Sequence, residues 1–97
     1  MKDNSATLVA VLAQPYNDAV SRADIDCRAS LMAGLGWVTD YWIDLALNWI
    51  EQEYPLDIEI VEMLEAISSR KELPQKTRHR AFTFAKRWRK AIHAKDT

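Results

Sequence analysis

The sequence predicts an all-α fold, a compact five-helix bundle in which residues 1–97 form a single helical domain. Ala, Leu, Glu, Lys and Arg, which are good helix formers, are plentiful, whereas two glycines and three prolines leave little room for the turns of an all-β fold. Apolar residues recur at helical spacing in five segments. A chain of 97 residues is long enough to bury a core without disulfides or metals.

The segment 41–54, YWIDLALNWIEQEY, is predicted to be the central, tryptophan-rich helix of the bundle. It is the most apolar stretch of the chain and holds two of the four tryptophans. Its polar residues fall in one narrow stripe at Asp44, Asn48, Glu51 and Gln52. A helix with so little polar surface is expected to be covered on most sides by other helices. Thr39 is its expected N-cap, and Tyr54-Pro55 closes it.

Two helices are predicted before this segment. The first covers residues 5–14 and ends at Gln14-Pro15, because the residue before a proline is disfavoured in the α region. The second runs from about residue 17 to Gly34, unless a weak capping box at 21–24 delays its regular part. Its expected buried face carries Val20, Ala23, Cys27 and Leu31.

Two further helices are predicted after the central one, at 58–70 and 74–93. Asp57 caps the first, and Pro74 opens the second. The connections are short, so the helices at 41–54, 58–70 and 74–93 are expected to be antiparallel neighbours. The buried positions expected in the last two are Ile60, Val61, Leu64, Ile67, Ala81, Phe84, Ala85, Trp88 and Ile92.

The charge is divided unevenly along the chain. Residues 1–69 contain three basic and twelve acidic side chains, a net charge of −9, whereas residues 70–97 contain ten basic and two acidic ones, a net charge of +8. Such an asymmetry either closes on itself within the fold or faces a charged partner.

Antiparallel packing predicts where these charges meet. An acidic corner of Glu51, Glu53, Asp57 and Glu59 is expected to neutralise Lys86, Arg87, Arg89 and Lys90. The opposite end gathers cations in the first turns of helix 74–93, where the helix dipole disfavours them, and this marks a candidate partner-binding site. Its residues are Arg70, Lys71, Lys76, Arg78, His79 and Arg80. The alternative is that carboxylates such as Asp24 and Asp26 neutralise this basic end.

No pattern typical of catalysis, metal binding or cofactor binding is present, so we expect no enzyme, no metal and no cofactor. The single cysteine, Cys27, reads as a small buried hydrophobe. His79 and His93 lack carboxylates at ligand spacing. The glutamates at 59, 62 and 65 read as a solvated helix face, and the tryptophans at 42, 49 and 88 as core.

The sequence also predicts a cytoplasmic protein. No apolar run reaches the roughly 18 residues of a membrane helix. The start, MKDNSATLVAVLA, resembles a weak signal sequence, but Asp3 interrupts the basic region that a signal requires, and a first helix is the better interpretation.

Two functions fit this pattern. The first is binding and neutralising another protein of opposite charge, such as a toxin or effector, as small bacterial immunity proteins and phage-borne inhibitors do. A basic partner would meet an acidic face formed by Asp44, Glu51, Glu59, Glu62 and Glu65. The second is nucleic-acid binding by the basic helix 74–93, which the acidic helices before it disfavour.

Overall fold

The computed structural model describes residues 5–95, and in this part of the chain every regular element is helical, which confirms the all-α prediction. The chain divides into two compact units, Met1–Tyr54 and Pro55–Thr97, and each is described here by itself. The expectation of a single domain stays a prediction. Six α-helices and one 3-10 helix occur in the described residues where five helices were expected.

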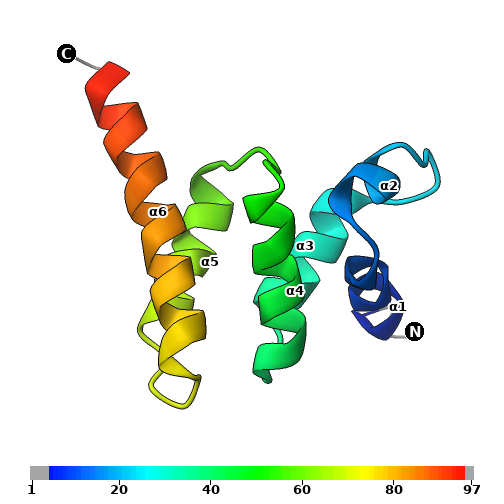
Figure 1. The fold of residues 1–97 in the computed structure, drawn as a ribbon, viewed down its shortest axis with the longest axis horizontal. Helices are drawn as coiled ribbons and strands as arrows, with labels where there is room; N and C mark the ends of the chain where they lie inside the picture. Colours follow the sequence, from blue (N-terminus) through cyan, green and yellow to red (C-terminus); the bar gives the residue numbers. More distant parts are fainter. Residues whose placement is uncertain (1–4, 96–97) are drawn as a thin grey trace. The chain divides into compact units, whose positions relative to one another are not determined.

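The first unit contains four α-helices and the 3-10 helix (Figure 1). The hydrophobic residues Val9, Leu12, Leu31 and Leu35 are buried in it. Helix α1 packs on α3, and α3 packs on α4, with η1 in contact with both. The elements are α1 (Ser5–Ala10), η1 (Val11–Ala13), α2 (Tyr16–Val20), α3 (Cys27–Leu35) and α4 (Asp40–Glu51).

The predicted single helix at 17–34 is wrong, because α2 and α3 are separate helices joined by residues 21–26. The carboxylate of Asp26 accepts a hydrogen bond of 3.0 Å from the Ala29 backbone N–H and so caps α3. This cap lies beyond the capping box expected at 21–24. Val20, which was expected on a buried face, is 52% exposed as a result.

Helix α4 buries five residues, whereas its Tyr41 is 60% exposed, so the expected cover on most sides is confirmed only in part. One end of α4 holds the segment that joins η1 to α2. The indole N–H of Trp49 donates to the carbonyl of Gln14 at 2.9 Å, and the Gln52 side-chain oxygen accepts from the Tyr16 backbone N–H at 2.7 Å. The Tyr16 ring lies 5.5 Å from Trp49 and 5.2 Å from Tyr54. The buried residues are Ile43, Ala46, Leu47, Trp49 and Ile50.

The end of α4 is a Schellman turn that places a non-glycine residue in the left-handed region. The N–H of Tyr54 bonds to the carbonyl of Trp49, and the N–H of Glu53 to that of Ile50. Glu53 has φ 74°, where glycine is usual.

The second unit is the helix pair α5 (Ile58–Ser68) and α6 (Gln75–Lys95), which lie side by side in opposite directions (Figure 1). The Asp57 carboxylate accepts from the Ile60 N–H at 3.0 Å, so the predicted cap is confirmed. All four buried positions expected in α5 are confirmed, at Ile60, Val61, Leu64 and Ile67.

The buried face expected on α6 is confirmed only in part. Ala81 and Ala85 are buried, whereas Phe84 and Trp88 are half-buried and Ile92 is 40% exposed. Helix α6 has 21 residues and α5 has 11, so the last turns of α6 extend beyond α5 (Figure 1). Helix α5 cannot cover apolar residues on those turns.

Candidate functional site: a basic-rimmed groove along helix α6

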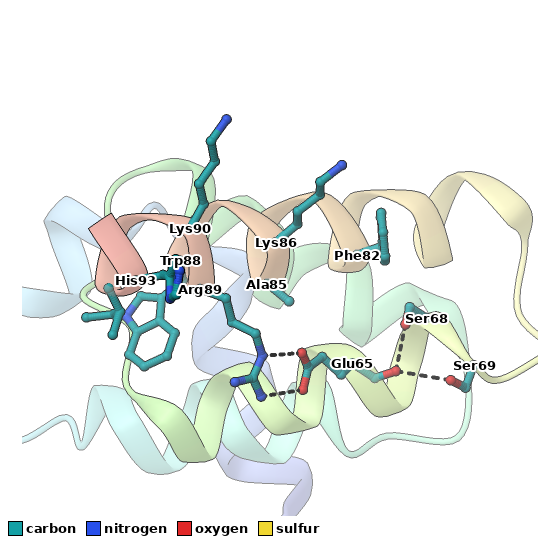
Figure 2. Close-up of a pocket in the computed structure, with 11 residues that line it drawn as sticks. Glu65, Ser68, Ser69, Phe82, Ala85, Lys86, Trp88, Arg89, Lys90 and His93 are labelled. Atoms are coloured by element: carbon teal, nitrogen blue, oxygen red, sulfur yellow. Dashed lines mark hydrogen bonds and ion pairs between the residues drawn. The ribbon is translucent and has the colours of Figure 1, made fainter. Parts of the chain in front are cut away.

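A groove of about 800 Å³ lies in the second unit, between the C-terminal end of α5 and the C-terminal half of α6 (Figure 2). Helix α6 supplies most of its lining, and α5 supplies one carboxylate and two hydroxyls. The lining residues are Glu65, Ser68, Ser69, Phe82, Ala85, Lys86, Trp88, Arg89, Lys90, Ile92 and His93.

Apolar side chains form the floor of the groove. Phe82 is 50% exposed and Ile92 40% exposed, which is unusual for large apolar residues, and Trp88, which also lines the groove, is half-buried. Ala85 is buried beneath. The apolar stripe of α6 is therefore wider than the surface that α5 covers, and the uncovered part lies in the groove.

Two lysines and a histidine form one edge of the groove. Lys86, Lys90 and His93 are exposed. Lys86 and Lys90 are four residues apart, one helical turn, and Figure 2 shows both side chains extending away from α5. The Lys86 ammonium lies 5.9 Å from the centroid of the Phe82 ring, a weak cation–π contact.

The single carboxylate that lines the groove is bound to an arginine from the facing helix. Arg89 donates through Nε and a terminal nitrogen to the two oxygens of Glu65, the second bond measuring 2.7 Å (Figure 2). This hydrogen bonding lowers the pKa of Glu65 and raises the pKa of Arg89. The carboxylate is therefore held charged and already paired at neutral pH.

The pairing of Arg89 corrects the expected neutralisation of the later cations. Its partner is Glu65 in the last turns of α5, and not the acidic corner expected near Asp57. Six residues, 69–74, connect α5 to α6, where about four were expected. Lys86 and Lys90 make no ion pair with the residues that the structure describes.

The serine hydroxyls of the groove are also engaged. Ser68 Oγ donates to the Glu65 carbonyl at 2.6 Å, and Ser69 Oγ donates to the same carbonyl at 3.4 Å (Figure 2). Both bonds close the last turn of α5. These hydroxyls therefore cap a helix end.

A second, smaller hollow of about 390 Å³ continues the groove toward the turn between α5 and α6. It shares Ser68 and Phe82 with the groove and adds Gln75, Arg78 and His79. Two residues of the predicted basic end, Arg78 and His79, thus border the same apolar ring, Phe82, as the cations of the groove.

The structure uses part of the predicted basic end for its own stability. Arg70 pairs with Glu72 at 2.8 Å, which lowers the pKa of Glu72. Arg78 Nε donates to the carbonyl of Leu73 at 3.1 Å, which fixes the start of α6. Arg80 is half-buried and also engaged in an interaction. The members left exposed are Lys71, Lys76 and His79.

The alternative partners considered for this basic end, Asp24 and Asp26, have other roles in the first unit. Asp24 pairs with Arg22 at 2.9 Å, and Asp26 caps α3. These carboxylates lie in the first unit and the basic end in the second, so the alternative that they neutralise the basic end stays a prediction.

The predicted acidic face is divided between the two units. Asp44 is half-buried and Glu51 exposed on α4, in the first unit. Glu59 and Glu62 are exposed on α5, in the second unit, whereas Glu65 belongs to the groove. Because the five residues belong to two units, the acidic face stays a prediction.

The remaining sequence candidates have these environments. Cys27 is half-buried, and burial together with the neighbouring Asp26 raises its pKa, which keeps the thiol protonated. Trp49 is buried as expected, but Trp42 and Trp88 are only half-buried.

Within residues 5–95, no group of three or more His, Cys, Asp or Glu residues is placed to hold a metal ion. No helix in the same range is long and apolar enough to cross a membrane.

Sequence reasoning missed Phe82 and the Glu65–Arg89 pair. Phe82 carried one available signal: it is a large aromatic residue outside the predicted apolar row of its own helix. The Glu65–Arg89 pair has no signal in the sequence. Its two residues are 24 positions apart, and their contact depends on the register between α5 and α6.

Comparison of this chain with models of protein families, with curated proteins and with solved structures found no match. The groove of the second unit is therefore the feature from which a function can be proposed.

Proposed function

We propose that this chain is a small non-enzymatic protein that binds another protein and neutralises or inhibits it. The observation that carries the proposal is the open groove of the second unit, where exposed Phe82 and Ile92 lie beside a row of cations. An exposed apolar surface with a charged rim is typical of protein-binding sites. Large apolar side chains anchor a partner, and the rim sets its orientation and rate of association.

The chemistry of the groove supports binding over catalysis. A general acid or base requires a carboxylate whose pKa lies near the working pH, but Arg89 moves the pKa of Glu65 in the opposite direction. The two serine hydroxyls donate to a backbone carbonyl and not to a base. We therefore keep the non-enzymatic assignment as part of the proposal.

The charge division of the chain supports a function of the immunity or inhibitor type for this chain. A toxin or effector with an acidic surface would be attracted to the +8 segment that contains α6. A cytoplasmic site of action in a bacterial or phage-infected cell belongs to the same proposal.

Site-specific photo-crosslinking in cells that naturally contain the chain tests this proposal. A photoreactive phenylalanine analogue at Phe82 should give one discrete adduct with another protein, whose activity the purified chain should then lower. The same analogue at Lys76, an exposed position of α6 outside the groove, is the matched control. Absence of a protein adduct at positions 82, 86 and 92 would contradict the proposal.

Nucleic-acid binding is the second candidate, and the exposed cations on α6 favour it. Lys76, Lys86, Arg87 and Lys90 are all exposed and could contact phosphates. Such binding falls steeply with salt because counterions are released. A duplex or single strand that binds at low ionic strength, and is lost when Lys86 and Lys90 are reversed to glutamate, would support it. No binding at low ionic strength would exclude it.

A further inference from the structure

Resting on the proposed function, we infer that the groove between α5 and α6 binds an acidic amphipathic helix of the partner protein. Such a helix presents one apolar face to a groove and carboxylates on its flanks. The groove has the complementary surfaces, an apolar floor with a basic edge, on one side of the second unit.

The floor has the length and chemistry that a short helix requires. Phe82 and Ile92 are ten residues apart, which is about 15 Å along α6 at 1.5 Å per residue. A partner helix places apolar side chains at i, i+3 or i+4, and i+7, which spans about 10 Å, less than the separation of Phe82 and Ile92 along α6. Trp88 also lines the groove and adds apolar surface.

The edge selects the sign of the partner's charge. Lys86, Lys90 and His93 follow one another along α6 at spacings of four and three residues, so they line the same side of the helix. Glu65 is the single carboxylate in the lining, and Arg89 pairs with it. Carboxylates on a docked helix are therefore attracted, and ammonium groups are repelled.

The adjoining hollow extends this selection toward the turn. Arg78 and His79 border it, and Phe82 separates it from the groove. A carboxylate placed beyond the Phe82 end of a docked helix would lie near the Arg78 guanidinium.

Fluorescence anisotropy with the full chain and a labelled synthetic peptide tests the inference. The probe is a helix of about four turns with leucines on one face and glutamates on its flanks. One control has the same composition with the leucines scattered around the helix, and a second has lysines for glutamates. The probe should bind saturably and at least about tenfold more tightly than the scattered control. The lysine peptide should not bind.

Substitutions in the chain show whether the probe peptide binds in the groove. Phe82→Ala and Lys86→Glu should each weaken it about fivefold or more, since one removes an anchor and the other reverses a rim charge. Both side chains are exposed, so the fold should survive, as circular dichroism can verify. Lys76→Glu makes the same charge change outside the groove and should alter binding by less than about twofold.

Four results would overturn the inference. The scattered peptide could bind as tightly as the probe, or Lys76→Glu could weaken binding as much as Lys86→Glu. The chain could also form a dimer that Phe82→Ala dissociates while the probe does not bind, which would assign the groove to a second copy. Cross-links from position 82 without probe binding would overturn only this inference. Probe binding without any cross-linked protein would overturn the proposed function.

Discussion

Gly34 lies inside α3 and is needed there for its size. It is buried, and a Cβ at this position would come within 2.4 Å of Leu12 Cδ1, 3.2 Å of Ala46 Cβ and 3.2 Å of the Trp42 carbonyl. Neither glycine is needed for a left-handed conformation. Gly36, the C-cap of α3, has φ −87°, and Gly34 also has no positive φ. Gly34 therefore lets α3, η1 and α4 approach closely.

We expect Gly34→Ala to lower the free energy of unfolding by about 1 kcal/mol. The substitution gains about 1 kcal/mol of helix propensity but overpacks a site where Leu12 is buried, which costs about 1–3 kcal/mol. Urea denaturation measures the difference. Gly36→Ala, at an exposed position, is the control and should change little. Equal stability of the two variants would show that the contact around Gly34 is looser than described.

Glu53 is the opposite case, a residue in a conformation that suits glycine. At φ 74° a side chain costs about 1–2 kcal/mol, whereas glycine loses about 0.4–1 kcal/mol more entropy on folding. Glu53→Gly should therefore raise the free energy of unfolding by up to about 1 kcal/mol. Glu62→Gly, the same change at an exposed position inside α5, should lower it by about 1 kcal/mol. Stabilisation absent from the first variant would contradict the left-handed turn.

At the scale of elements, α5 and α6 are held in register by the Glu65–Arg89 pair as well as by their apolar faces. Because Arg89 lowers the pKa of Glu65 in the folded state, the pair stabilises the fold above the ordinary pKa of the carboxyl. This contribution is lost as the pH falls through the lowered pKa. The exposure of both side chains keeps the contribution small.

The pKa of the Glu65 carboxyl, followed by NMR, should therefore lie below its ordinary value of 4.5 and return toward it in Arg89→Gln. Lys86→Gln, which removes a neighbouring charge that makes no hydrogen bond to Glu65, should shift it much less. A pKa unchanged by Arg89→Gln would mean that the two side chains do not pair in solution.

The sequence predicted some elements well and others poorly for identifiable reasons. Helix α5 was predicted to within two residues because Asp57 caps it and its apolar row fits between short connections. The 17–34 helix was wrong because its apolar spacing continues through residues 21–26, although Asp26 begins a new helix there. Periodicity alone cannot detect a break at which the pattern stays in phase.

For the whole molecule, the sequence showed the division of charge along the chain. It did not show which of the cations are paired and which are exposed. The basic end was expected to be bare and the later cations paired. The structure instead engages Arg70 and Arg78 at the turn and leaves Lys86 and Lys90 exposed beside an apolar groove. Which cations are paired depends on the register of α6 along α5. This register is a property of the tertiary structure that residue spacing does not contain.

We propose that the groove along α6, and not the basic turn, recognises the partner. An NMR titration of the full ¹⁵N-labelled chain with the acidic amphipathic peptide tests it most directly. The account predicts that the largest amide shifts fall between Phe82 and His93 and around Ser68. Shifts confined to residues 70–80, or to the first unit, would contradict it.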